Sequence, residues 1–105
     1  MQAWLAAFVV TQLCELPVYY AATRRWSVGF FASAITHPLV WFAFPLLPLP
    51  YWPMVACAEL FAVLAEAAWL RANGLRWARA LGWSLAANAT SLSIGLTLRA
   101  TTGLV

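Results

Sequence analysis

The sequence predicts an all-α integral membrane protein, a four-transmembrane-helix antiparallel bundle with proline kinks in helices 1 and 2. Of the 105 residues, 65% are hydrophobic and 9% are charged, and the mean hydropathy is +0.81. A soluble domain of this length leaves much of its surface in water, so it could not bury so many apolar side chains. The apolar residues also form four segments of about 20 residues, the length that crosses a bilayer core of about 30 Å.

The four predicted spans cover residues 3–23, 27–47, 52–72 and 76–98. Together they form a single transmembrane domain over residues 1–105. The connections ATRRWS, LPLPYWP and RANGLR are short, so consecutive helices run antiparallel. Asn73 and Gly74 predict the end of the third helix, and Pro53 fits its first turn, where a missing N–H is tolerated.

Prolines interrupt the backbone hydrogen bonding of the first two predicted helices. Neither Pro17 nor Pro38 can donate the helical backbone hydrogen bond, so each frees a carbonyl oxygen one turn earlier. Each proline also lies close to an ionisable side chain, Glu15 or His37. Because freed acceptors at membrane depth persist where they are buried in protein or line a wet cavity, these kinks predict a built site inside the bundle.

The arginines predict the orientation of the chain in the membrane. Five of the six lie in or beside the first and third connections, namely Arg24, Arg25, Arg71, Arg76 and Arg79. Cytoplasmic loops carry an excess of basic residues, so we expect a multi-pass protein of the bacterial inner membrane with its N- and C-termini outside. Arginines scattered over helix ends do not form a continuous basic surface, and nucleic acid is therefore not an expected partner.

The three acidic residues carry the strongest indication of function. Glu15, Glu59 and Glu66 all lie within predicted spans and none lies in a connection. A charged side chain near the bilayer centre costs about 2.5–3.5 kcal/mol on insertion scales, so such residues mark functional sites. With a rise of about 1.5 Å per residue, Glu15, His37 and Glu59 fall into one layer near the midplane, and Glu66 lies deeper toward the cytoplasm.

Small and polar side chains form one face of each predicted helix. Membrane helices turn such faces toward one another, because lipid offers them no hydrogen-bonding partner. We therefore expect a metal or proton site inside the bundle, built from Glu15, His37, Glu59 and Glu66. The supporting polar residues would be Thr36, Asn88 and Ser91, and Cys14 and Cys57 are additional candidate ligands if they do not serve simply as small hydrophobic residues.

Three carboxylates without a buried arginine require protons or a bound cation to neutralise them. In one interpretation, the glutamates and His37 hold a divalent metal ion, and their oxygen and imidazole ligands suit zinc, manganese, iron or nickel. In another, the acids bind and release protons, and this is coupled to the transport of an ion or solute. In a third, the chain is an accessory or assembly subunit of a larger membrane complex, and the polar residues only bond helices together.

No motif in the chain indicates an enzyme. The sequence contains neither a nucleophile elbow nor an HExxH pair, and a ferritin-type di-metal site would need a second histidine. Four short helices make a thin bundle. We therefore expect a homo-oligomer or a place in a larger membrane complex, in contact with the lipid bilayer.

Four stretches of the chain carry a resemblance to known proteins. CELPVYY, ITHPLVWF, AELFAVLAEAAWL and LAANATSLSIGL resemble a group of small four-span bacterial membrane proteins with ExPV, THPLxWF, AExxxVxxE and AN-x-x-S signatures. This resemblance covers nearly the whole chain, and it implies a fold and a set of positions but no activity. The positions are Glu15, Thr36, His37, Pro38, Glu59, Glu66, Asn88 and Ser91.

A second resemblance is architectural. In length, number of spans and the place of Glu15 midway along the first helix, the chain is similar to the small multidrug resistance transporters. That family has one essential membrane acid, whereas this chain has three and a histidine. The resemblance implies a proton-coupled exporter of the small multidrug type as an alternative function.

Overall fold

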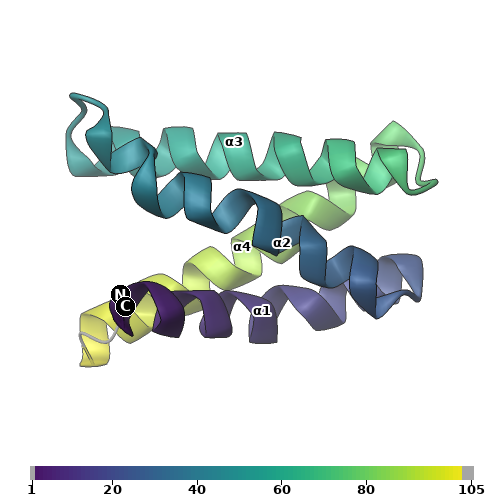
Figure 1. The fold of residues 1–105 in the computed structure, drawn as a ribbon, viewed down its shortest axis with the longest axis horizontal. Coiled ribbons are helices and arrows are strands. Elements are labelled where there is room, and N and C mark those ends of the chain that lie inside the picture. Colours follow the sequence, from purple (N-terminus) through teal and green to yellow (C-terminus); the bar gives the residue numbers. More distant parts are fainter. Residues whose placement is uncertain (1, 103–105) are drawn as a thin grey trace.

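The protein is all-helical over residues 2–102, the part of the chain that the computed structural model describes. The helices are α1 (Gln2–Thr23), α2 (Trp26–Phe42), the short 3-10 helix η1 (Phe44–Leu46), α3 (Tyr51–Ala72) and α4 (Trp77–Thr102). Consecutive α-helices run in opposite directions along the molecule (Figure 1).

The helix bounds differ from the predicted ones at two places. The second helix was predicted to reach residue 47, but α2 ends at Phe42 and the chain continues into η1. Pro45 accounts for this difference, because proline has no N–H to donate the backbone hydrogen bond that would continue the α-helix. The fourth helix continues past residue 98 to Thr102. The bounds of α1 and α3 agree with the prediction to within one residue, and Gly74 stops α3 with a φ of +109°.

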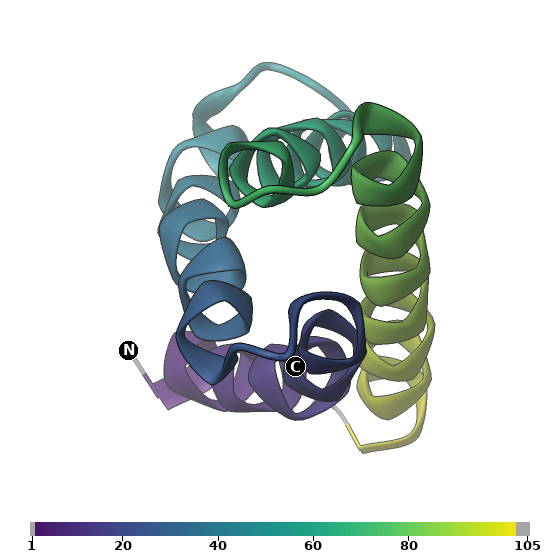
Figure 2. The same ribbon diagram turned by 90° about the vertical axis from the view of Figure 1, so that its right-hand side faces the viewer.

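The four α-helices form a ring, as the end-on view in Figure 2 shows. Both α1 and α3 pack against α2 and α4, whereas the backbones of the diagonal pairs do not come close to each other within the described residues. The first and third connections meet at one end, where Arg25 Nη2 donates a 2.6 Å hydrogen bond to the Asn73 carbonyl. The longest dimension is 36 Å, so the molecule matches the thickness of a bilayer core of about 30 Å.

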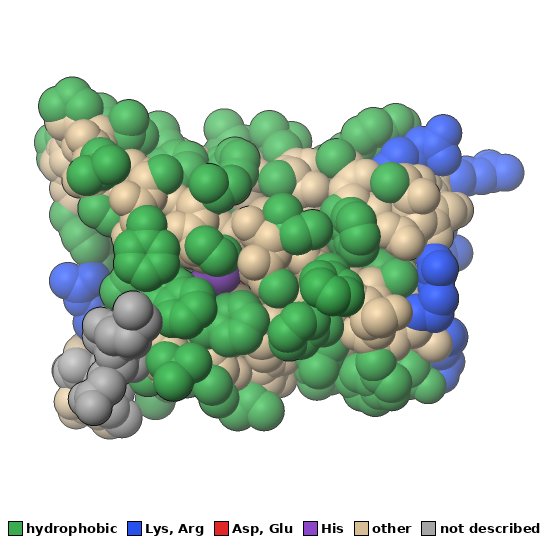
Figure 3. Space-filling view, viewed as in Figure 1, with side chains coloured by type: hydrophobic (Ala, Val, Ile, Leu, Met, Phe, Trp, Pro, Cys, Tyr) green, Lys and Arg blue, Asp and Glu red, His purple; other side chains and the backbone are tan. Residues whose placement is uncertain are grey.

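Three of the helical segments are long and apolar enough to cross a membrane. They are Trp4–Thr23, Trp26–Leu46 and Tyr51–Ala72. Hydrophobic side chains cover much of the face shown in Figure 3, and arginine side chains lie at its two ends. Large apolar side chains point away from the bundle, as at Leu13, which is 72% exposed. This distribution is typical of a surface solvated by lipid.

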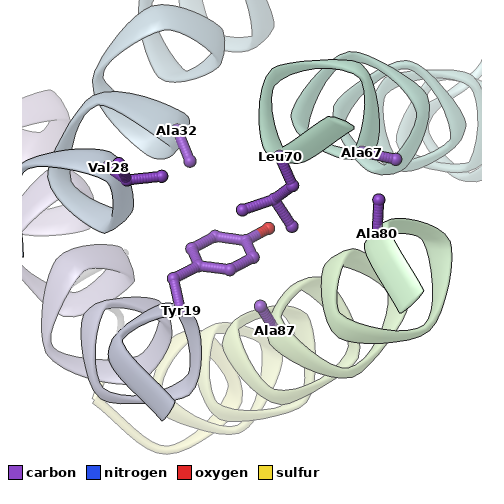
Figure 4. Packing of buried hydrophobic residues seen from close by; sticks show 7 residues of the cluster. All are labelled: Tyr19, Val28, Ala32, Ala67, Leu70, Ala80 and Ala87. Carbon is purple, nitrogen blue, oxygen red and sulfur yellow. The ribbon is translucent and has the colours of Figure 1, made fainter. Parts of the chain in front are cut away.

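The hydrophobic core lies toward the end at which the first and third connections meet. It consists of Tyr19, Val28, Ala32, Ala67, Leu70, Ala80 and Ala87. Figure 4 shows the Tyr19 ring and the Leu70 side chain meeting in the centre of the helix ring. Gly29 lets α2 approach α1 closely, because an added Cβ would lie 3.1 Å from Leu16 Cδ1 and from Tyr19 Cβ. The core therefore closes this end of the bundle.

Candidate functional site

Two carboxylates lie in the interior of the bundle, Glu15 on α1 and Glu66 on α3. Each is 2% exposed. Both face inward because each precedes a core residue by one turn, Glu15 before Tyr19 and Glu66 before Leu70. Their hydrogen-bond partners lie one turn apart on the same two helices, Ser33 and Thr36 on α2 and Asn88 and Ser91 on α4, so the two carboxyl groups are neighbours. The two residues, called the carboxylate pair below, therefore form the centre of the site.

Two hydroxyl groups hold the Glu15 carboxylate. Ser33 Oγ on α2 donates to Oε1 at 2.7 Å, and Ser91 Oγ on α4 donates to Oε2 at 2.5 Å. Ser33 lies one turn after Gly29, a residue at which α2 approaches α1 closely. Glu15 thus joins its own helix to both neighbours in the ring.

Three side chains hold the Glu66 carboxylate. Tyr19 Oη on α1 and Asn88 Nδ2 on α4 donate to Oε1, at 2.5 and 3.1 Å. Thr36 Oγ1 on α2 donates to Oε2 at 2.7 Å. Asn88 is itself oriented by a 2.9 Å hydrogen bond from Nδ2 to the Ser84 carbonyl. Glu66 therefore bonds α3 to all three other α-helices, including α1 across the diagonal of the ring.

All five donors to the carboxylate pair are electrically neutral. Hydroxyl and amide groups stabilise a carboxylate by hydrogen bonding, but they do not cancel its charge. The arginines of the described chain stand in connections and near helix ends, away from this layer. Two adjacent carboxyl groups cannot both be ionised without strong repulsion. The arrangement therefore suits the binding of a proton or another cation.

A cavity of about 200 Å³ opens beside the carboxylate pair. Its polar lining includes Glu15, Thr36, His37, Glu59, Glu66, Asn88 and Ser91. Tyr51 and Arg99 also border it, at the end of the bundle opposite the hydrophobic core. All the glutamates, the histidine and the supporting polar residues that the sequence singled out thus face one cavity, and their role as a metal or proton site stays a prediction.

His37 and Glu59 stand apart from the hydrogen bonds of the carboxylate pair. The His37 ring packs among Trp4, Phe8 and Trp41, with ring centroids 5.9, 5.3 and 6.1 Å away. His37 is 8% exposed, and its Nε2 has no hydrogen-bond partner within the described residues. The sequence-based depth estimate placed Glu15 in a layer with His37 and Glu59, whereas the structure makes its buried pair from Glu15 and the deeper Glu66.

The cysteines do not join the site. Cys14 is partly buried, Cys57 is exposed, and neither borders the cavity. Over residues 2–102, no three side chains of the types His, Cys, Asp or Glu are arranged to hold a metal ion. A zinc, manganese, iron or nickel ion at this cavity remains a prediction.

Sequence reasoning did not single out three residues that shape this site: Tyr19, Tyr51 and Arg99. Tyr19 lies four residues after Glu15 on the same helix face, and this spacing was the signal that could have identified it. Tyr51 begins α3 and Arg99 lies near the end of α4. Only the antiparallel packing of α3 against α4 brings these two together.

Comparison with models of known protein families, with curated proteins and with solved structures finds no match for this chain. Fold and site together define an all-helical protein with three helices able to cross a membrane and a carboxylate pair buried between them. Its activity is therefore inferred from its own residues.

Proposed function

We propose that the chain is a four-span protein of the bacterial inner membrane whose carboxylate pair binds protons during the transport of an ion or small solute. In this proposal α4 is the fourth span, since its 26 residues are long enough to cross a bilayer. Its exposed hydroxyl groups are compatible with lipid. Thr90 and Thr97 donate at 2.8 Å to carbonyls one turn earlier, so their hydroxyls are paired within the helix.

The observation that carries this proposal is the set of neutral donors around two adjacent carboxyl groups. Tyr19, Thr36 and Asn88 donate to Glu66, and Ser33 and Ser91 donate to Glu15. One proton held between the carboxyl groups removes their mutual repulsion and leaves a single negative charge on the pair. A buried acid that can gain and lose a proton in this way is a typical element of membrane transporters.

The prolines and the cavity support movement at this site. Pro17 and Pro38 lie inside α1 and α2, close to Glu15 and His37, and the freed carbonyls favour kinks at these points. With the arginine-rich connections in the cytoplasm and both termini outside, the cavity faces outward and the hydrophobic core closes the inner side. Transport then requires the helices to open the core and close the cavity.

Infrared difference spectroscopy on the protein in lipid vesicles tests the proton centre. A protonated carboxyl group has a carbonyl stretching band that a carboxylate lacks. We expect this band at neutral pH in the unmodified protein, and we expect Glu15→Gln and Glu66→Gln each to remove it. Glu59→Gln serves as the matched control, because Glu59 borders the same cavity but does not belong to the carboxylate pair. If the unmodified protein has no such band, the proposal is wrong.

A divalent cation is the second candidate occupant. It is favoured by one observation: Glu15, His37, Glu59 and Glu66 border the same cavity, and His37 Nε2 has no partner in the described structure. Elemental analysis of the purified protein tests this candidate. A stoichiometric metal that Glu59→Gln removes supports it, and the absence of metal from both proteins excludes it.

A further inference from the structure

The cavity has opposite charges at its two ends. The carboxylate pair lies at its inner end and Arg99 borders its outer end. Ser91 donates a hydrogen bond to Glu15, and Arg99 lies eight residues later on the same helix, α4. At about 1.5 Å per residue this distance is about 12 Å along the axis, and the Arg99 and Glu15 side chains can shorten it. The two charges are thus separated by the length of a small molecule.

Arg99 is held in position at the outer end. Its Nη1 donates a hydrogen bond to the Tyr51 hydroxyl, and its guanidinium carbon lies 4.5 Å from the centroid of the Tyr51 ring. A guanidinium group has several N–H donors in a planar fork that matches a carboxylate or phosphate. Because Tyr51 accepts from only one of these nitrogens, Arg99 retains donors that can bind an anionic group.

His37 provides an independent indication that the cavity takes a ligand. The residue is only 8% exposed, its side chain borders the cavity, and its Nε2 lacks a hydrogen-bond partner within residues 2–102. A buried polar atom without a partner costs free energy that a ligand can offset. Trp41 and Tyr51 add aromatic surface to the cavity lining.

We propose that the cavity binds a small zwitterion, with its ammonium group at the carboxylate pair and its anionic group at Arg99. This inference rests on the proposed function, because the ammonium group meets the negative charge that the shared proton leaves on the pair. A simple cation would leave Arg99 unpaired, and a simple anion would face the carboxylates. A cavity of about 200 Å³ has the volume of about six or seven water molecules, which suits an aliphatic amino acid of a few carbons.

Binding of matched probes to the protein in lipid nanodiscs tests the zwitterion. The probes are γ-aminobutyrate, butylamine, which lacks the carboxylate, and butyrate, which lacks the amine; β-alanine and ε-aminohexanoate vary the charge separation. We expect a zwitterion of this series to bind about tenfold more tightly than butylamine or butyrate. Arg99→Gln should weaken zwitterion binding by about tenfold and leave butylamine binding unchanged.

Arg79→Gln is the matched control, since Arg79 is an exposed arginine at the other end of α4. The inference is wrong if butylamine binds as tightly as every zwitterion, or if no zwitterion binds. It is also wrong if Arg99→Gln and Arg79→Gln weaken zwitterion binding equally. The infrared measurement on the same preparation separates the two proposals. If Glu15→Gln removes the carboxyl band but no zwitterion binds, the proton centre is supported and the zwitterion proposal is wrong. If the unmodified protein has no carboxyl band, the proton centre itself is wrong.

Discussion

At the scale of single residues, Tyr19 links the core to the site. Its ring is fully buried in the hydrophobic core, while its hydroxyl donates to Glu66 at 2.5 Å. Tyrosine suits this position because it combines a large apolar body with one polar atom at its tip. The same side chain therefore fills the closed end of the bundle and contacts a proposed proton carrier.

This double role predicts the effect of Tyr19→Phe. The change keeps the ring but removes one of the two donors to Glu66 Oε1, so the unfolding free energy should fall by about 0.6–2 kcal/mol. Tyr20→Phe is the matched control, because Tyr20 stacks on Trp26 in the next helix with ring centroids 4.0 Å apart. Unfolding in mixed detergent micelles measures both variants. Equal stability of the two would show that the Tyr19 hydroxyl contributes nothing.

At the scale of helices, small residues decide how closely the elements approach. Gly29 is buried where α2 meets α1, and Ala67, Ala80 and Ala87 line the packed faces of α3 and α4. Membrane helices associate through such close packing, because lipid already solvates their apolar side chains. The serine and threonine donors to the carboxylate pair can reach their acceptors only at this close spacing.

Gly29→Ala tests the close approach of α1 and α2. The new Cβ would lie 3.1 Å from Leu16 Cδ1 and from Tyr19 Cβ, so we expect a loss of about 1 kcal/mol in unfolding free energy. Gly82→Ala is the control on α4, since a Cβ at Gly82 meets nothing within 4 Å and alanine is the better helix former. A Gly29→Ala protein as stable as the Gly82→Ala protein would contradict close packing at Gly29.

At the scale of the whole molecule, the ring of helices separates an open end from a closed one. The cavity reaches Tyr51 and Arg99, whereas Tyr19 and Leu70 fill the interior near the arginine-rich connections. The carboxylate pair lies between these two regions. Access to the pair is therefore one-sided in this structure, and the proposed transport function would require a second state that opens the other side.

Labelling of introduced cysteines tests the orientation that this arrangement implies. In a protein with Cys14→Ala and Cys57→Ala, we expect Leu49→Cys to react with a membrane-impermeant maleimide in intact cells. Ala72→Cys at the arginine-rich end should react only after the membrane is opened, because basic connections remain in the cytoplasm. Both positions are exposed in the structure. The reverse labelling pattern would mean that the termini and the cavity face the cytoplasm.

The sequence by itself determined where the helices lie along the chain, because apolar length, proline and glycine act locally. It missed the early end of α2 at Phe42, although Pro45 was visible as the local reason. It also identified the acids as exceptional, since none of them lies in a connection. The tertiary structure alone decided that Glu15 shares its interior site with Glu66, while His37 and Glu59 border the same cavity outside the carboxylate pair. Counting residues gives depth along a straight helix, but the partners of a buried carboxylate depend on the rotation and tilt of every helix, which packing fixes.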